Sequence, residues 1–274
     1  MRPLVVLLAL LLTLGLGACK KCNDPCNIDC DNYDPCCGQS PADASFTIYE
    51  VLGYKPQPNI VGFEVVDQPT DTIIFINFAK MVADFEADYY EWKVGDDERT
   101  WNTKDLTLRF GLIPYYTPVD IQLKVYKSTS SACFPNANDT AVFKRTLITV
   151  PYDSSKIYGK YQGFVDSKPN EPNFFQIETY KRSDGRNLYT VQGISRNCSI
   201  NPSWGLEDYA IGYRSFYVSS LGTKLGCCHG LSAFGIVKDQ ELTLKYGSYP
   251  ESQDSCQWSV RNDPYNNNRF TGRK

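Results

Sequence analysis

The sequence predicts an all-β protein. Aromatic residues make up 14% of the chain, with 19 Tyr and 14 Phe, and these residue types prefer strands. Short runs that alternate apolar and polar residues recur along the chain, with Gly, Pro and Asp between them, as in strands joined by turns. No long stretch repeats its apolar residues at the helical period. The 274 residues divide into a leader, a tether and two β-domains.

The charge balance and the scarcity of histidine narrow the range of functions. The chain has a formal net charge of −3, whereas a protein that follows a phosphate backbone needs a basic face. His229 is the single histidine, and many general-base and metal-dependent mechanisms use this side chain. The common phosphate-loop, serine-nucleophile and zinc-protease motifs are absent from the sequence. We therefore expect no nucleic-acid partner, no enzyme activity, no cofactor and no metal; paired carboxylates, as in glycosidases, are the catalytic arrangement that composition leaves open.

Residues 1–18 have the pattern of a secretory leader. Arg2 precedes a predominantly apolar run at 4–16, which is too short to span a bilayer and is typical of a signal peptide. The motif Leu16-Gly17-Ala18-Cys19 resembles the lipobox of bacterial lipoproteins. The resemblance implies that Cys19 is lipidated and that the mature chain is membrane-anchored, because several acyl chains on one residue anchor stably. Cleavage of an ordinary signal peptide just before Cys19 is the alternative.

The residues that follow the lipobox indicate on which side of the membrane the protein lies. The segment Lys20-Lys21-Cys22-Asn23-Asp24 is similar to the segment that follows the lipidated cysteine in surface-exported lipoproteins of the Bacteroidetes type. That family prefers consecutive acidic residues here, and this chain departs from it in that respect. The similarity implies an outer-membrane lipoprotein of the cell envelope that faces outward, and the periplasmic face is the alternative.

Residues 19–44 are predicted to form a disordered, cysteine-rich tether. The segment has almost no apolar residues and therefore cannot pack a core alone. An oxidising envelope favours disulfides, whereas a metal site made of cysteines lacks its usual paired Cys-x-x-Cys motifs. A calcium loop at Asp29, Asp31 and Asp34 lacks the Gly and the closing Glu of an EF-hand. Disulfides are thus the expected state of the five cysteines that follow Cys19, which are Cys22, Cys26, Cys30, Cys36 and Cys37.

The number of cysteines predicts a link between the tether and the first domain. Apart from Cys19, ten of the eleven cysteines remain. Four lie late in the chain, where they can pair among themselves, and the other six are the five of the tether and Cys133. We therefore expect Cys133 to form a disulfide with a tether cysteine, which requires Cα atoms within about 7 Å. The four late cysteines are Cys198, Cys227, Cys228 and Cys256.

Two of the late cysteines are adjacent. Neighbouring residues on a strand face opposite sides, so Cys227 and Cys228 are expected to bond different partners. A nucleophile or zinc cluster at Cys227-Cys228-His229 is the alternative, but adjacent strand residues diverge, and the cysteine spacing matches no common zinc pattern. Two disulfides are the expected state in an oxidising compartment.

Residues 45–152 are predicted to form a β-sandwich, because alternating runs recur at regular spacing with turn residues between them. The octapeptide Tyr90-Glu91-Trp92-Lys93-Val94-Gly95-Asp96-Asp97 resembles the Tyr-x-Trp-x-Phe-Gly-Asp-Gly signature of PKD domains, with Asp97 in place of the final Gly. The resemblance implies an immunoglobulin-like sandwich that serves as a spacer or an interaction surface. The expected strands lie in 45–51, 73–78, 90–94, 106–108, 119–125 and 140–150.

Three features of this domain are candidates for packing or binding. Trp92 is expected in the core between the two sheets. Trp101 lies in a polar stretch, where it either caps the sheet edge or is exposed for binding. The acidic run at 96–98 is expected to be a solvated turn, with a calcium site made of oxygen ligands as the alternative.

Residues 153–274 are predicted to form an antiparallel meander of short alternating strands. Such a meander avoids exposed edges by closing into a barrel. The segments Gly159-Lys160-Tyr161-Gln162-Gly163 and Phe270-Thr271-Gly272 resemble the first and last strands of small lipocalin-like domains of envelope lipoproteins, which implies a lipocalin-like β-barrel. Aromatic side chains are expected to fill its interior, and a pocket for one small ligand is the alternative.

These observations predict an envelope lipoprotein that acts as a non-enzymatic binding or structural module. Its expected partners are the membrane, through the lipid, and an envelope protein or glycan. Two alternatives stay open. A carrier would enclose a small apolar or glycan ligand in the C-terminal barrel, which requires a cavity. A surface carbohydrate-binding protein would present Trp101, Trp204 and nearby tyrosines as a flat platform.

Overall fold

The regular structure of the chain is almost entirely β, as the sequence predicts. The computed structural model describes residues 24–53, 66–75, 77–111, 113–128, 133–135, 139–166, 168–181, 187–193, 211–219, 231–248 and 268–274. These residues form fifteen strands and one 3-10 helix, and none of them lies in an α-helix. Within this part of the chain, no helix has the length and apolar character needed to cross a membrane.

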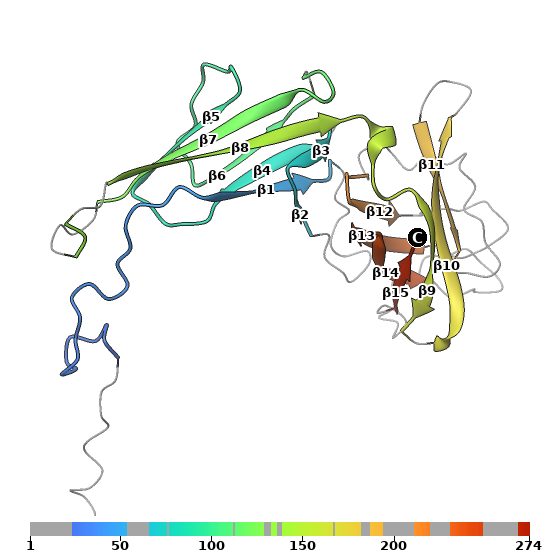
Figure 1. Ribbon diagram of the computed structural model, residues 1–274. Coiled ribbons are helices and arrows are strands. Elements are labelled where there is room, and N and C mark those ends of the chain that lie inside the picture. Colours follow the sequence, from blue (N-terminus) through green and yellow to red (C-terminus); the bar gives the residue numbers. More distant parts are fainter. Residues whose placement is uncertain are drawn as a thin grey trace, which may run out of the picture.

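Eight strands build the first domain as two four-stranded sheets (Figure 1). The sheet orders are β2-β1-β4-β6 and β3-β8-β7-β5. The described ladders are antiparallel except that between β3 and β8. The strands are β1 (Phe46–Val51), β2 (Gln68–Pro69), β3 (Thr72–Ile74), β4 (Phe78–Ala83), β5 (Tyr89–Val94), β6 (Asp105–Arg109), β7 (Pro118–Tyr126) and β8 (Thr140–Val150).

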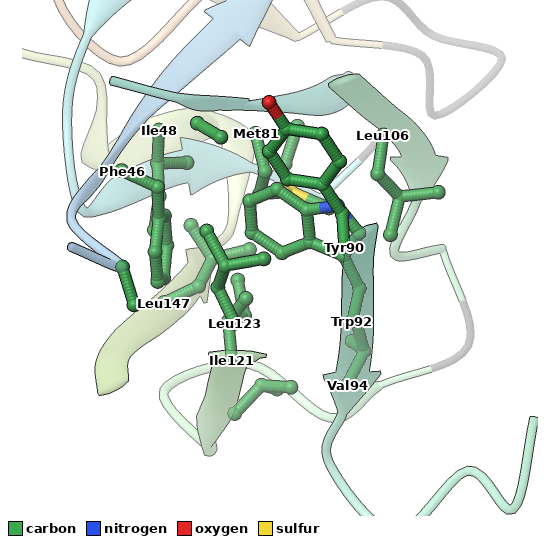
Figure 2. Packing of buried hydrophobic residues seen from close by; sticks show 14 of the residues in the cluster. Phe46, Ile48, Met81, Tyr90, Trp92, Val94, Leu106, Ile121, Leu123 and Leu147 are labelled. Atoms are coloured by element: carbon green, nitrogen blue, oxygen red, sulfur yellow. The ribbon is translucent and has the colours of Figure 1, made fainter. Parts of the chain in front are cut away.

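The two sheets enclose one apolar core, so the domain is a β-sandwich. Inward-facing residues come from alternate positions of each strand, as the sequence pattern predicts; on β7 they are Val119, Ile121, Leu123 and Val125. Trp92 lies among these residues with no exposed surface, which confirms its predicted place (Figure 2). Its indole Nε1 donates to the carbonyl of Thr103 at 2.7 Å, so the ring is buried without an unpaired polar atom.

The apolar run at 73–78 is two strands rather than one, which corrects the sequence-based expectation. β3 ends at Ile74 in one sheet, and β4 begins at Phe78 in the other. A tight turn joins them, in which the backbone N–H of Asn77 donates to the carbonyl of Ile74 at 2.9 Å. Apart from Asn77 the run is apolar, and the chain crosses here from one layer of the sandwich to the other.

The described residues of the C-terminal domain include seven strands, which form a single antiparallel sheet in the order β11-β10-β9-β15-β14-β13-β12. A 3-10 helix, η1 (Tyr152–Ser154), links the two domains. The strands are β9 (Gly159–Val165), β10 (Lys168–Lys181), β11 (Asn187–Gly193), β12 (Ser215–Ser219), β13 (Leu231–Lys238), β14 (Glu241–Ser248) and β15 (Asn268–Arg273).

The described strands of this domain do not close into the barrel that the sequence analysis predicts. β11 and β12 form the two edges, and no ladder joins them among the described residues. Instead, the first domain covers the β12 side of the sheet. Leu52 packs with Tyr217 and Phe234, while Ile74 and Val150 join the apolar cluster on the other face. At the β12 edge, Ile211 of the preceding segment forms an antiparallel bridge with Phe216, and covering of this kind protects an edge strand without closure.

Aromatic rings fill the described core of the C-terminal sheet. Phe175 stacks on Phe216 with 5.7 Å between ring centroids, and Phe270 lies 6.5 Å from Phe175. All three rings are fully buried. Gly235 faces the Phe216 ring so closely that a Cβ atom there would lie 2.2 Å from it. This packing accords with the filled interior that the aromatic content predicts.

Candidate functional site

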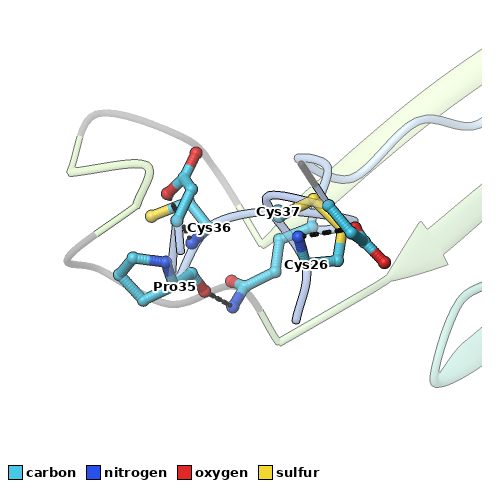
Figure 3. The surroundings of a disulfide bond; sticks show 7 residues. Cys26, Pro35, Cys36 and Cys37 are labelled. Atoms are coloured by element: carbon cyan, nitrogen blue, oxygen red, sulfur yellow. Dashed lines mark hydrogen bonds between the residues drawn. A yellow bond between two sulfur atoms is a disulfide. The ribbon is translucent and has the colours of Figure 1, made fainter. Parts of the chain in front are cut away.

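Residues 24–44 of the tether form a series of turns, although the composition of the tether predicts disorder. Carboxylate and amide side chains close these turns by accepting backbone N–H bonds two residues on: Asp24 from Cys26 and Asp34 from Cys36, both at 2.9 Å. Such Asx turns need no apolar core. They bring Cys26 and Cys37 into a disulfide with Cα atoms 5.0 Å apart (Figure 3).

A second disulfide fastens the tether to the first domain. Cys36 bonds Cys133 across 97 residues of sequence, with Cα atoms 5.4 Å apart. This is the pairing of Cys133 with a tether cysteine that the cysteine count predicts. Cys30 is buried and also disulfide-bonded. Lys127 adds a hydrogen bond from its Nζ to the Oγ of Ser40 at 2.8 Å, so the attachment does not depend on the sulfur bridge alone.

The two attachments of the first domain lie at opposite ends of β8. Cys133 is in the connection between β7 and β8, whereas Val150 ends β8 beside the C-terminal domain (Figure 1). A strand rises about 3.4 Å per residue, so the eleven residues of β8 span about 35 Å. The tether therefore approaches the sandwich far from the C-terminal domain.

Polar contacts hold the linker that follows η1 against the C-terminal domain, at the other end of the first domain. Ser155, just after η1, donates its hydroxyl to the carbonyl of Gly212 at 2.6 Å. The backbone N–H of Lys156 donates to the carbonyl of Tyr213 at 2.7 Å. The segment 211–214 is itself folded back on β12, since Gly212 donates to Ser215 at 2.7 Å. The linker and the segment 211–214 thus form one hydrogen-bonded unit, the junction.

A buried carboxylate from the first domain lies at the centre of the junction. Glu50 is only 1% exposed. Its Oε1 accepts the backbone N–H of Ile74 at 2.8 Å and the Nδ2 of Asn77 at 2.9 Å. Its Oε2 accepts the backbone N–H of Tyr213, from the C-terminal domain, at 2.6 Å. Each carboxylate oxygen therefore has a donor, and one of these donors belongs to the other domain.

Asn77 repeats this bridging role. It is fully buried, and its Nδ2 also donates to the carbonyl of Ile211 at 2.7 Å. Its Oδ1 accepts the backbone N–H of Gly53 at 3.3 Å. Because buried polar groups are costly when unpaired, Glu50 and Asn77 favour a single seating of the C-terminal domain on the first.

Burial controls the proton affinity of Glu50. Desolvation raises its pKa from 4.5 to about 7, while the hydrogen bonds from Asn77, Ile74 and Tyr213 offset part of that rise. The carboxyl group is thus close to half-ionised at neutral pH. Asn77 carries no charge, and no cation forms an ion pair with Glu50 in the described part of the chain.

Trp101 caps the edge of the sandwich, one of its two predicted roles. Its backbone exchanges hydrogen bonds with Trp92 of β5 at 2.8 and 3.3 Å. The ring is half-buried against the core, and the Arg99 guanidinium lies 5.4 Å above its centre. Trp101 therefore offers little of the flat exposed surface that a sugar platform requires.

In the acidic segment that follows β5, Asp97 forms an ion pair with Arg99. The Arg99 guanidinium donates to Asp97 at 2.6 Å and lowers the pKa of that exposed carboxyl to about 2. The described residues contain no group of three or more potential metal ligands. The other predicted site residues lie outside the described residues; they are Cys19, Cys198, Trp204, Cys227, Cys228 and Cys256.

Sequence reasoning missed Glu50 and Asn77, although the sequence contains a signal for one of them. Phe46, Ile48 and Glu50 occupy alternate positions of β1, and all three face inward. A carboxylate on the apolar face of a strand must find partners. Those partners could not be named in advance, because Ile74 and Tyr213 are distant in sequence.

Comparison with known proteins gives no family assignment. The chain matches no protein-family model, no curated protein and no solved structure at the significance required.

Proposed function

We propose that this protein is a lipid-anchored protein of the cell envelope that works as a rigid, non-enzymatic arm. The lipid at Cys19 holds the chain at the membrane, the tether joins the lipid to the sandwich, and the C-terminal domain is the part presented to partners. The PKD-like sandwich acts as the spacer between them.

The position of the two attachments carries this proposal. The disulfide from Cys36 to Cys133 lies at one end of the first domain, and the junction around Glu50 lies at the other. The buried bonds of Glu50 and Asn77 favour one arrangement of the two domains, because any other would leave buried polar groups unpaired. Interfaces between freely moving domains are mostly small and polar. Here apolar residues of both domains also share one core.

The alternatives gain less support from the described residues. A carrier needs an interior cavity, whereas Phe175, Phe216 and Phe270 pack against one another in the C-terminal core. A carbohydrate platform at Trp101 would need an exposed ring, and that ring is half-buried under Arg99.

Membrane fractionation of two cysteine variants tests the anchor. Cys19→Ser removes the thiol that accepts the lipid, and we expect the variant to move from the membrane fraction to the soluble fraction. Cys133→Ser is the matched control, because it also removes one thiol but leaves the lipidation site, and it should stay with the membranes. Retention of Cys19→Ser in the membrane fraction would refute the proposal.

A further inference from the structure

The outer face of the C-terminal sheet presents exposed aromatic and charged side chains. It is formed by the outward-facing positions of β10, β9, β15 and β14, and we call it the β9 face. Register fixes its rows: Phe174 lies opposite Gln162, which lies opposite Arg273. In the next row Phe164 lies opposite Thr271. The far part of the same side, over β12 and β13, is covered by the first domain, so the β9 face is the open remainder.

Two phenylalanines are exposed on this face. Phe164 is 47% exposed and Phe174 is 39% exposed, whereas Phe175, which points to the opposite face of the sheet, is fully buried. Gln162 lies between them, because it is directly opposite Phe174 and two residues before Phe164 on β9. The face thus presents two aromatic rings on neighbouring strands with a hydrogen-bonding amide between them.

One cation lies over one of these rings, and further cations occupy the same face of a chain that is acidic as a whole. The Lys160 ammonium lies 4.8 Å from the centre of the Phe174 ring. Arg273 is mostly exposed and pairs with Glu241 at 2.9 Å. The outward positions of the four strands carry four cationic side chains and two carboxylates; the cations are Lys160, Lys245, Arg269 and Arg273, and the carboxylates are Glu178 and Glu241. Asp166, which directly follows β9 and is exposed beside Arg269, adds a third carboxylate. Cations therefore still exceed carboxylates on this face, although the net charge of the chain is −3.

We propose that the β9 face binds an acidic polysaccharide. A sugar ring offers a face of C–H groups that packs on the negative face of an aromatic ring. Lysine and arginine pair with the carboxylates of uronic acids through charge-assisted hydrogen bonds, and Gln162 can donate to or accept from hydroxyl groups. An exposed sheet face suits an extended polymer that crosses several strands.

The place of the face in the fold favours a polysaccharide over a lipid surface. The tether is fastened at Cys133, at the end of β8 remote from the C-terminal domain. About 35 Å of strand therefore separates the stapled tether from the C-terminal domain. This inference depends on the proposed function in one respect, which is that the first domain holds the C-terminal domain away from the membrane.

Binding measurements on a lipid-free chain test the inference. The full chain with Cys19→Ser is titrated with polygalacturonate as the acidic probe and with dextran as a neutral one. We expect binding to polygalacturonate that weakens at high salt, because exposed charges are screened. Combined Phe164→Ala and Phe174→Ala substitutions should weaken it about tenfold, the cost of a typical anchor residue. Lys160→Gln, which leaves both rings in place, should reduce the salt dependence.

A matched control uses the other domain. Tyr89 and Tyr126 are exposed, lie directly opposite each other on the outer face of the sandwich, and should be replaceable by Ala without loss of polygalacturonate binding. Absence of binding by the parent, equal binding of dextran, or equal weakening in the tyrosine control would overturn the inference. Binding to phosphatidylglycerol vesicles that depends on the same phenylalanines would overturn it in favour of a membrane. Because the probe chain has no lipid, these outcomes are separate from the test of the anchor.

Discussion

Replacing Glu50 by Gln should remove a specific dependence of stability on pH. In the parent, the carboxylate is desolvated at the junction, and its pKa is about 7 in the folded chain against 4.5 when exposed. A raised folded pKa contributes stability that is fully present below pH 4.5 and is lost as the pH rises through 7. Between pH 5 and pH 8 this loss amounts to about 2 to 3 kcal/mol of unfolding free energy, at 1.36 kcal/mol per pKa unit.

The Gln variant has no carboxyl group to titrate. Its amide oxygen can still accept from Ile74 and Asn77, but its NH2 group faces the backbone N–H of Tyr213, so one hydrogen bond is lost at every pH. We therefore expect the variant to be less stable than the parent at pH 5 by about 1 to 3 kcal/mol. At pH 8 this difference should shrink or reverse, because only the parent then buries a charge.

Urea denaturation followed by tryptophan fluorescence at pH 5, 6, 7 and 8 measures the effect, with Trp92 as a buried reporter. Glu98→Gln is the control, because it removes an exposed carboxyl from a turn of the same domain, and its offset from the parent should stay constant. The reasoning about Glu50 fails if the Glu50→Gln variant keeps a constant offset from the parent across this pH range.

Three further substitutions probe the packing and the staple. Gly212→Ala places a Cβ 2.7 Å from the buried Oε2 of Glu50 and should lower the unfolding free energy by about 1 to 3 kcal/mol in the same urea titration. Gly111→Ala is its control and should change the unfolding free energy little, because a Cβ there meets no atom closer than 3.9 Å. Replacing Cys36 and Cys133 together by Ser opens a loop of 97 residues and should cost up to about 4 kcal/mol; an unchanged urea midpoint under oxidising conditions would show that the staple does not stabilise the domain. Trp92→Ala should cost about 3 to 5 kcal/mol, as for a large buried ring, and calorimetry would contradict this if the melting temperature barely moved.

Strand positions were predictable where one face of a strand is buried and the other is exposed to solvent. β7 is the clearest case, since Val119, Ile121, Leu123 and Val125 alternate with polar residues and all face the core. The prediction failed at 73–78, where Ile73 and Ile74 are both buried and the period of two is lost. A single Asn within the run, although a turn-favouring residue, does not by itself indicate that the chain crosses to the other sheet there.

The expected barrel shows a different kind of limit. A meander whose edges need cover can close on itself or lie against another surface, and both solutions fit the same alternating pattern. The choice here is made by Leu52, Ile74 and Val150, which belong to the first domain and pack on the C-terminal sheet. No local pattern records a contact between domains.

The sequence by itself determined the β class, the inward-facing residues of most strands and the pairing of Cys133 with the tether, because alternation and cysteine parity are properties of the chain read in order. The tertiary structure alone decided which residues meet. Glu50 gains its three donors, and with them its altered pKa, only when Ile74, Asn77 and Tyr213 are brought together from distant parts of the chain. Burial and hydrogen-bond partners are set by three-dimensional proximity, and proximity between remote segments is fixed only by the completed fold.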